Sequence, residues 1–211
     1  ICMKDAYDVP TSHDFFDMKH NRAFAEQQEA RPERRTIMEG FVREILNHAP
    51  SGAKILEVGS GYGALARAIL STCSVNQYFL FDYSPQMHDL SRETLKAYEG
   101  QTHYHLGNFR EQDWTVGLPD DFDVVVTLQT VHELRHASRI PELYRQVLNM
   151  LRPGGVFLVS DIVNTAEVHR DHCLTPEEHL SLLSSLGFEG SSVVLSAEDQ
   201  PLIRARAKDR T

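Results

Sequence analysis

Three glycines, Gly59, Gly61 and Gly63, stand at alternate positions in the stretch KILEVGSGYGALARAIL. An apolar run precedes them, and an alanine- and leucine-rich run follows. Glycine lowers stability within ordered segments, so this cluster indicates a sharp turn or a close approach of the backbone to another group. The residues from Gly59 to Ala64 also fit the Gly-x-Gly-x-x-Ala pattern of a dinucleotide-binding loop. We therefore expect a ligand at the junction between a strand and a helix, rather than a tight turn alone.

A carboxylate, Asp82, ends the next apolar run, about 20 residues beyond the glycines. In nucleotide-binding α/β domains, an acid at this place accepts hydrogen bonds from ribose hydroxyls. The alternative is a solvated carboxylate at the end of a strand. Together, the glycines and Asp82 favour a ligand that contains a ribose.

The elements that must position these residues follow from the hydrophobic pattern. Apolar side chains at helical spacing predict helices, and short apolar runs predict strands. The predicted helices cover residues 33–48, 64–71, 84–97, 140–151 and 175–187. The predicted strands cover residues 54–58, 77–81, 102–106, 122–128, 156–162, 191–195 and 201–207. Pro153, Gly154 and Gly155 are expected to separate the fourth of these helices from the fifth strand.

The alternation of strands and helices predicts an α/β fold, a doubly wound and mostly parallel sheet with helices on both faces. No helix separates the last two strands, so we expect them to form an antiparallel hairpin. Residues 1–35 are polar with scattered aromatic side chains, and we expect them to form an N-terminal helical cap or lid. In such sheets ligands bind at the carboxyl ends of the strands, where the glycine loop is expected.

The composition argues against several functions. The 211 residues suit one α/β domain, and the formal charge of −9 disfavours a broad surface for nucleic acid or anionic membrane. The sequence has no apolar run long enough to span a membrane, and we expect no signal peptide. Cys2, Cys73 and Cys173 are widely spaced, which is typical of a reducing compartment, so we expect a cytoplasmic protein.

Several motifs together resemble those of class I S-adenosylmethionine-dependent methyltransferases. LEVGSGYG resembles the first motif of that family, with Glu57 two places before the first glycine. FLFDYSPQMHDLSRE resembles the continuation of the second strand, with Asp82 at the ribose position. GNF, residues 107–109, stands where the family often has Gly-Asp-Ala at the adenine. DVVVTLQTVHEL and VLNMLRPGGVFLVSD resemble the motifs at the fourth and fifth strands, and the likeness covers roughly residues 36–207.

The resemblance implies a Rossmann-like sheet of seven strands, with the last strand antiparallel. It also implies that residues 36–211 form an S-adenosylmethionine-binding methyltransferase domain behind the cap. Asn108 replaces the acid that is usual at the adenine, and its amide can both accept and donate hydrogen bonds. The cofactor-binding residues that the resemblance implies are Glu57, Gly59, Ser60, Gly61, Gly63, Asp82, Tyr83, Met87, Asn108, Phe109, Leu128 and Gln129.

Two other interpretations of the glycine loop stay open. A nicotinamide-dependent oxidoreductase explains the glycines and Asp82, but it explains Glu57 less well, and the sequence contains no Tyr-x-x-x-Lys pair. A domain with the methyltransferase fold could also bind the cofactor without catalysis. Cofactor binding followed by turnover assays would separate these interpretations.

The methyl acceptor is expected to be a small molecule. TLQT, residues 127–130, replaces the Asn/Asp-Pro-Pro-Tyr motif that amino-directed nucleic-acid methyltransferases have after the fourth strand. No Pro-Cys pair is present for cytosine methylation, and the net charge is acidic. A protein side chain is the second choice of acceptor. The sequence leaves a homodimer open.

Methyl transfer depends mainly on alignment, and a base is needed only when the acceptor arrives protonated. His132 follows the fourth strand and, with an unperturbed pKa of about 6.5, is the best-placed general base. Its alternative role is to shape the loop. Glu133 is its neighbour, and we expect only one of the two side chains to face the pocket.

The cap and the link after the fifth strand are expected to cover the substrate. The aromatic and histidine side chains of the cap that are predicted to face it are Tyr7, Phe15, Phe16 and His20. Ordinary packing of a cap helix is the alternative for each aromatic side chain. His169, His172 and Cys173 in the link do not complete a set of four metal ligands, so no metal site is predicted.

Overall fold

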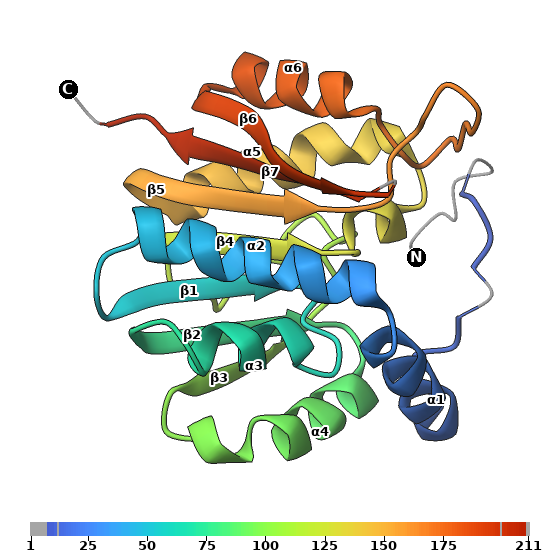
Figure 1. Cartoon of the computed structure of the whole chain (residues 1–211), viewed down its shortest axis with the longest axis vertical. Helices are drawn as coiled ribbons and strands as arrows, with labels where there is room; N and C mark the ends of the chain where they lie inside the picture. Colours follow the sequence, from blue (N-terminus) through green and yellow to red (C-terminus); the bar gives the residue numbers. More distant parts are fainter. Residues whose placement is uncertain (1–7, 12, 199, 210–211) are drawn as a thin grey trace.

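The computed structural model describes residues 8–11, 13–198 and 200–209, and they form a three-layer α/β arrangement (Figure 1). Seven strands form one sheet in the order β3-β2-β1-β4-β5-β7-β6. The strands are β1 (Ala53–Val58), β2 (Val75–Asp82), β3 (Thr102–Leu106), β4 (Phe122–Leu128), β5 (Leu151–Ser160), β6 (Phe188–Ala197) and β7 (Gln200–Ala207). The α-helices are α1 (Met18–Glu29), α2 (Pro32–His48), α3 (Ala64–Leu70), α4 (Pro85–Thr94), α5 (Ile140–Met150) and α6 (Pro176–Leu186).

The direction of the strands confirms the predicted topology. β2, β1, β4 and β5 pair in parallel, and β3 pairs in parallel with β2. β7 lies between β5 and β6 and is antiparallel to both. The fold is therefore a Rossmann-like, mostly parallel sheet with its last strand reversed. The carboxyl ends of β2, β1 and β4 lie next to one another at one edge.

Alternate residues of the central strands point to opposite faces of the sheet, and each face has its own core. Ile55 of β1 packs with Ile37 and Phe41 of α2 on one face. Leu56 packs in the other core, which includes Tyr144 of α5. These side chains are almost completely buried, so both layers of helices are held by apolar packing.

The transition from α5 to β5 differs from the prediction. The expected separation by Pro153, Gly154 and Gly155 is wrong, because α5 runs directly into β5 at Leu151. Phe122 pairs with Leu151, whereas Val124 pairs with Val156, so the prolyl-glycyl segment forms an irregularity within the strand. β5 also ends at Ser160, which leaves Asp161 just beyond the strand at the carboxyl edge.

Within the described residues of the predicted cap, helix α1 lies at the edge toward which the parallel strands point (Figure 1). The Asp17 side chain caps α1 by accepting from the backbone N–H groups of Lys19 and His20. The predicted boundary between residues 35 and 36 falls within α2, so this helix connects the cap to the domain. No helix in the described parts of the chain combines the length and the apolar character that a membrane span needs.

Candidate active site

A cavity of about 240 Å³ lies where β1, β2 and β4 end, and the cap forms part of its wall. One water molecule occupies about 30 Å³ in the liquid, so the cavity has room for a larger ligand. Many of the residues predicted to bind cofactor or substrate line it. They are Phe15, Glu57, Gly59, Ser60, Gly61, Asp82, Tyr83, Met87, Phe109, Leu128, Gln129 and His132.

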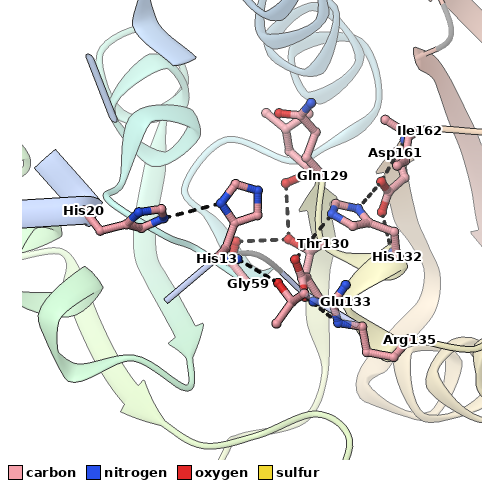
Figure 2. Close-up of polar contacts among 12 residues, drawn as sticks. His13, His20, Gly59, Gln129, Thr130, His132, Glu133, Arg135, Asp161 and Ile162 are labelled. Carbon is pink, nitrogen blue, oxygen red and sulfur yellow. Dashed lines mark hydrogen bonds and ion pairs between the residues drawn. The ribbon is translucent and has the colours of Figure 1, made fainter. Parts of the chain in front are cut away.

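The glycine loop leaves open space at one position only. Gly61 has a φ of +51°, and a Cβ built on it would meet nothing within 4 Å. At Gly59 a Cβ would instead collide with the side chain of Thr130, whose hydroxyl donates to the Gly59 carbonyl at 3.3 Å (Figure 2). The Gly61 backbone is therefore free to lie against a ligand, while Gly59 is required by packing against the end of β4.

The Asp82 carboxylate is buried at the end of β2 and faces both the loop and the cavity. Its Oδ2 accepts from the N–H of Gly61 at 2.8 Å, and its Oδ1 accepts from the N–H of Ser84 at 2.9 Å. Burial raises the pKa of Asp82 to about 6, although these backbone donors oppose the rise. Each carboxylate oxygen has a second lone pair, so Asp82 can still accept hydrogen bonds from a ligand.

A second buried carboxyl, Glu57, lines the cavity from the end of β1. The hydroxyl of Tyr78 donates to its Oε2 at 2.7 Å. Burial raises the pKa of Glu57 to about 8, and the negative charge of Asp82 adds to the rise. Glu57 is therefore mostly neutral at pH 7.

His132 lies in the 3₁₀ turn η2 (Val131–Leu134), directly after β4, and contacts two carboxylates (Figure 2). Its Nδ1 lies 2.6 Å from Oδ1 of Asp161, and its Nε2 lies 3.5 Å from Oε1 of Glu133. Burial alone would lower the pKa of His132, but Asp161 and Glu133 outweigh it and raise the pKa to about 10. The imidazole is therefore protonated at neutral pH, which the unperturbed value did not lead us to expect.

Both His132 and Glu133 line the cavity, so the expectation that only one of them faces it is wrong. Successive side chains of a 3₁₀ turn are about 120° apart, whereas those of a strand point to opposite faces, so both side chains can reach the cavity. Arg135 holds Glu133 in place, with its Nε 3.2 Å from Oε2 of the carboxylate. The pKa of Glu133 is lowered because His132 and Arg135 outweigh the effect of burial.

Among the predicted lid residues, Phe15 lines the cavity and Phe16 and His20 do not. Phe16 is 55% exposed, and its ring meets the Tyr83 ring edge to face, with the ring centroids 5.4 Å apart. His20 stands behind His13, with its Nε2 3.3 Å from Nδ1 of that residue, and His13 itself lines the cavity. Tyr7 lies outside the described residues.

Two predicted cofactor-binding residues do not line the cavity. Gly63 is the N-cap of α3, and a Cβ there would contact the Ser91 hydroxyl, so the glycine serves helix packing. Asn108 turns away because its Oδ1 accepts from the N–H of Arg110 at 3.0 Å. The neighbouring Phe109 does face the cavity.

The segment before α1 is fastened over the cavity edge at several points. Asp8 pairs with Arg139, 2.7 Å from its Nη1, and also with Arg110. The N–H of Val9 donates to the Arg135 carbonyl at 3.1 Å. The Ser84 hydroxyl donates to the Phe15 carbonyl at the other end of the segment. These contacts hold the cap against the ends of β2 and β4.

Other residues of the cavity wall were not predicted from the sequence. They are His13, Phe24, Gln28, Arg31, Arg34, Tyr62, Leu65, Thr130, Glu133 and Ile162. A signal was present for Arg34, which stands three residues before Ile37 and seven before Phe41, on the apolar stripe of α2. A charged residue at a buried helical position indicates a function or a partner.

Comparison with known proteins supports a methyltransferase family. A family profile described as "Methyltransferase domain" matches residues 56–157. A sterol 24-C-methyltransferase of Yarrowia lipolytica is 31% identical over 58% of this chain and 32% of its own length. The highly reducing polyketide synthase verA of Penicillium polonicum is 24% identical over 57% of this chain and 5% of its own length. The chain thus spans a minor part of these curated relatives.

Solved structures share the fold. The CurJ carbon methyltransferase has a TM-score of 0.75 at 17% identity, over 93% of this chain and 62% of that chain. The N-methyltransferase NodS of Bradyrhizobium japonicum, in complex with S-adenosylhomocysteine, has a TM-score of 0.69 at 16% identity, over 86% of this chain and 90% of that chain. The fold is that of a Rossmann-like domain, and its cavity lies at the carboxyl ends of the parallel strands. The family profile, the methyltransferase relatives and the shared fold support the class I S-adenosylmethionine-dependent methyltransferase family.

Proposed function

We propose that the protein transfers a methyl group from S-adenosylmethionine to a small molecule by in-line displacement. The observation that carries the proposal is one cavity lined by the glycine loop, by Asp82 and by His132. A ribose-binding acid and a proton-handling side chain then face the same ligand. The NodS neighbour, whose structure holds S-adenosylhomocysteine, supports the choice of cofactor.

The residues around the cavity fit the cofactor. The open space at Gly61 lets a ligand lie against the backbone, and Asp82 has acceptor capacity left for ribose hydroxyls. Phe109 offers an aromatic face beside the end of β3 for an adenine ring. When bound, S-adenosylmethionine supplies a methyl group on a positively charged sulfur that leaves as a neutral thioether.

His132 would control the proton of the acceptor. Asp161 fixes the ring, since a carboxylate can only accept and Nδ1 must therefore carry a proton. Because the resting imidazole is protonated, the site must lose one proton before a protonated acceptor can react. After that loss the remaining proton can lie in one of two places. Either it is on the methyl acceptor and the neutral imidazole takes it during the transfer, or it is already on the imidazole, which then stabilises an anionic methyl acceptor. The base role of His132 remains a prediction in this form.

A small acceptor is favoured because the cap forms one wall of the cavity. Phe15 and Phe24 line it from the cap, and their rings lie 5.4 Å apart. An aromatic wall fastened over the cavity excludes water and limits the size of the acceptor. The net charge of −9 also disfavours a nucleic-acid acceptor.

The experiment is calorimetry with S-adenosylmethionine and S-adenosylhomocysteine, followed by turnover with panels of small molecules and peptides. Asp82→Ala should weaken binding by about 10- to 100-fold, since a hydrogen bond to a charged group contributes about 1.5–3 kcal/mol. Asp89→Ala is the matched control, because Asp89 lies on the exposed side of α4 with 63% of its side chain accessible. Unchanged affinity in Asp82→Ala would defeat the assignment.

Each competing function predicts a different result. Binding of nicotinamide dinucleotide in place of S-adenosylmethionine would establish an oxidoreductase. Cofactor binding without turnover on either panel would indicate a binding module. Turnover on peptides alone would indicate a protein methyltransferase.

A further inference from the structure

Three aromatic rings of the cap form a wall on one side of the cavity. They belong to His13, Phe15 and Phe24, and all three side chains line the cavity. Their ring centroids lie 5.4 to 5.6 Å apart in every pairing. The His13 and Phe15 rings are nearly parallel, with 17° between their planes. Such a wall offers ring faces and edges on which a flat ligand group can stack.

The two ends of this wall face different parts of the cavity. Phe15 and Phe24 pack against the cluster formed by the glycine loop and α4. The His13 ring instead lies toward the end of β4, where the charges of Glu133 and His132 act on it (Figure 2). The ribose of the cofactor is expected at the end of β2, so His13 borders the space that remains for the methyl acceptor.

The His13 ring is held in place and carries no charge at pH 7. Its Nδ1 lies 3.3 Å from Nε2 of His20. Burial lowers the pKa of His13 below its usual value of 6.5, and the charges of His20 and His132 add to the fall, although Glu133 opposes it. The ring therefore offers the methyl acceptor a flat surface rather than a charge.

The residues after β4 place a cation beside the same space. His132 is protonated at neutral pH, because Asp161 and Glu133 hold its proton. The His172 ring lies 6.3 Å from the His132 ring, and burial and the charge of His132 lower the pKa of His172. The His132 imidazolium can thus stabilise an anionic oxygen. It disfavours an acceptor that is cationic or becomes cationic during the transfer.

The hydroxyl of an acceptor must be acidic enough to yield its proton to this ring. The pKa of His132 is about 10, and that of the tyrosine hydroxyl, a phenol, is also about 10. Water, which a saturated alcohol resembles, has a pKa of about 15.7. A phenol or an enol therefore shares its proton with His132 at little cost, whereas a saturated alcohol does not. Methylation of a neutral amine leaves a cation beside the imidazolium.

We propose that the methyl acceptor is a planar, conjugated hydroxyl compound, a phenol or an enol, which stacks on His13 and places its hydroxyl at His132. The inference rests on the proposed function and deepens it by naming the class of acceptor. In the reaction, the oxygen of the acceptor, or the carbon conjugated with it, forms a bond to the methyl carbon. The bond from that methyl carbon to sulfur breaks, and its electron pair stays on the sulfur. The hydroxyl proton passes to the neutral imidazole of His132.

Ionisation of a bound phenol can be measured without turnover. The probe is 2-naphthol, added at pH 8 to protein saturated with S-adenosylhomocysteine, which has no methyl group to transfer. In water at this pH a phenol is mostly un-ionised. The longer-wavelength absorption of the naphtholate anion should appear on binding to the wild-type protein and be absent in His132→Gln. A wild-type complex without naphtholate contradicts the proposal, whether the compound binds un-ionised or does not bind.

Matched acceptors test the class by turnover. 2-Naphthol and the enol of pentane-2,4-dione should be methylated, whereas decahydro-2-naphthol and 2-naphthylamine should not. Analysis of the product distinguishes methylation at oxygen from methylation at carbon. Comparable turnover of the saturated alcohol or the amine overturns the inference. If S-adenosylmethionine binds and neither the phenol nor the enol reacts, the inference fails and the cofactor assignment stands. A protein that does not bind S-adenosylmethionine overturns the proposed function and this inference with it.

Two variants of His13 test the stacking contact. His13→Leu should raise the KM for 2-naphthol by about 2- to 10-fold, with kcat and the affinity for S-adenosylhomocysteine unchanged. His13→Phe keeps an aromatic ring and should keep the KM within about 2-fold. His169→Leu is the control, since the His169 side chain is 79% exposed. An unchanged KM in His13→Leu would remove His13 from the acceptor site, and a loss of cofactor affinity would make its role structural.

Discussion

The side chains of His132 and Asp161 form a close pair, with Nδ1 and Oδ1 2.6 Å apart and the backbone N–H of His132 donating to Oδ2 at 3.0 Å. Asp161 is nearly completely buried, and the positive charge of His132 lowers its pKa despite that burial. The pair therefore holds the His132 ring in one orientation and one protonation state, directly after the end of β4. This rigid geometry is the basis of the first two predictions.

His132→Gln should lower turnover by about 10²- to 10⁴-fold while leaving cofactor affinity within about 2-fold, because the ring acts on the acceptor and not on the cofactor. Steady-state kinetics and calorimetry measure the two effects. His169→Gln is the control, since the His169 side chain is 79% exposed. Near-normal turnover in His132→Gln would return this residue to shaping the loop.

The turnover rate should increase as the pH rises above neutrality. Because the pKa of His132 is about 10, the reactive site forms as pH rises toward that value, so the rate should increase from pH 7 to 10. Glu133→Gln removes one of the two carboxylates that stabilise the imidazolium, and it should move this limb to lower pH. Rate profiles and NMR titration of the ring check the shift. A limb that stays in place would mean that Glu133 does not set the pKa of His132.

Stability should fall as pH rises through the range set by Glu57. Burial raises the pKa of Glu57 from 4.5 to about 8, so between these values the folded protein holds a proton that the unfolded chain releases. The free energy of unfolding then decreases as pH increases over this range. Glu57→Gln keeps an acceptor for the Tyr78 hydroxyl, and it should reduce the dependence of the free energy of unfolding on pH. Urea unfolding at pH 5, 6.5 and 8 measures this dependence. The same dependence in the wild-type protein and in Glu57→Gln would contradict the raised pKa of Glu57.

Substitutions at two glycines with similar backbone conformation can distinguish a loss of ligand contact from an effect of backbone strain. Gly61 and Gly190 have φ values of +51° and +61°, and neither would place a Cβ within 4 Å of another atom. Substitution by valine should therefore destabilise both variants by a similar amount, about 1–3 kcal/mol. Only Gly61→Val should lose cofactor binding, because only Gly61 lines the cavity. Equal binding by the two variants would remove Gly61 from the ligand site.

The predicted site residues that line the cavity have one feature of the chain in common. The glycine loop, Asp82 and His132 all follow apolar strands, and the ends of parallel strands meet at one edge once the topology is known. Linear order and strand pattern therefore suffice to bring them together. The same reasoning gave seven strands and the reversed last strand.

The sequence could not predict where side chains turn within loops. Asn108 and Phe109 are neighbours, yet only Phe109 faces the cavity, because the Asn108 side chain bonds to its own turn. The pKa of His132 also depended on Asp161, which lies 29 positions further along the chain. Arg34 reaches the cavity from α2, and its contact with Gln129 joins residues too far apart in the chain for a local pattern to reveal. Long-range contacts of this kind arise from packing, not from local pattern.

The hydrogen bond from the Gly61 N–H to Asp82 means that the ligand-free loop is already preorganised. The carboxylate that would receive a ribose also orders the backbone on which the rest of the ligand lies, so little conformational entropy remains to be lost there on association. Removing Asp82 therefore has two separable effects, one on a direct contact and one on loop order. Hydrogen exchange at the Gly61 amide would report the second effect in the absence of any ligand.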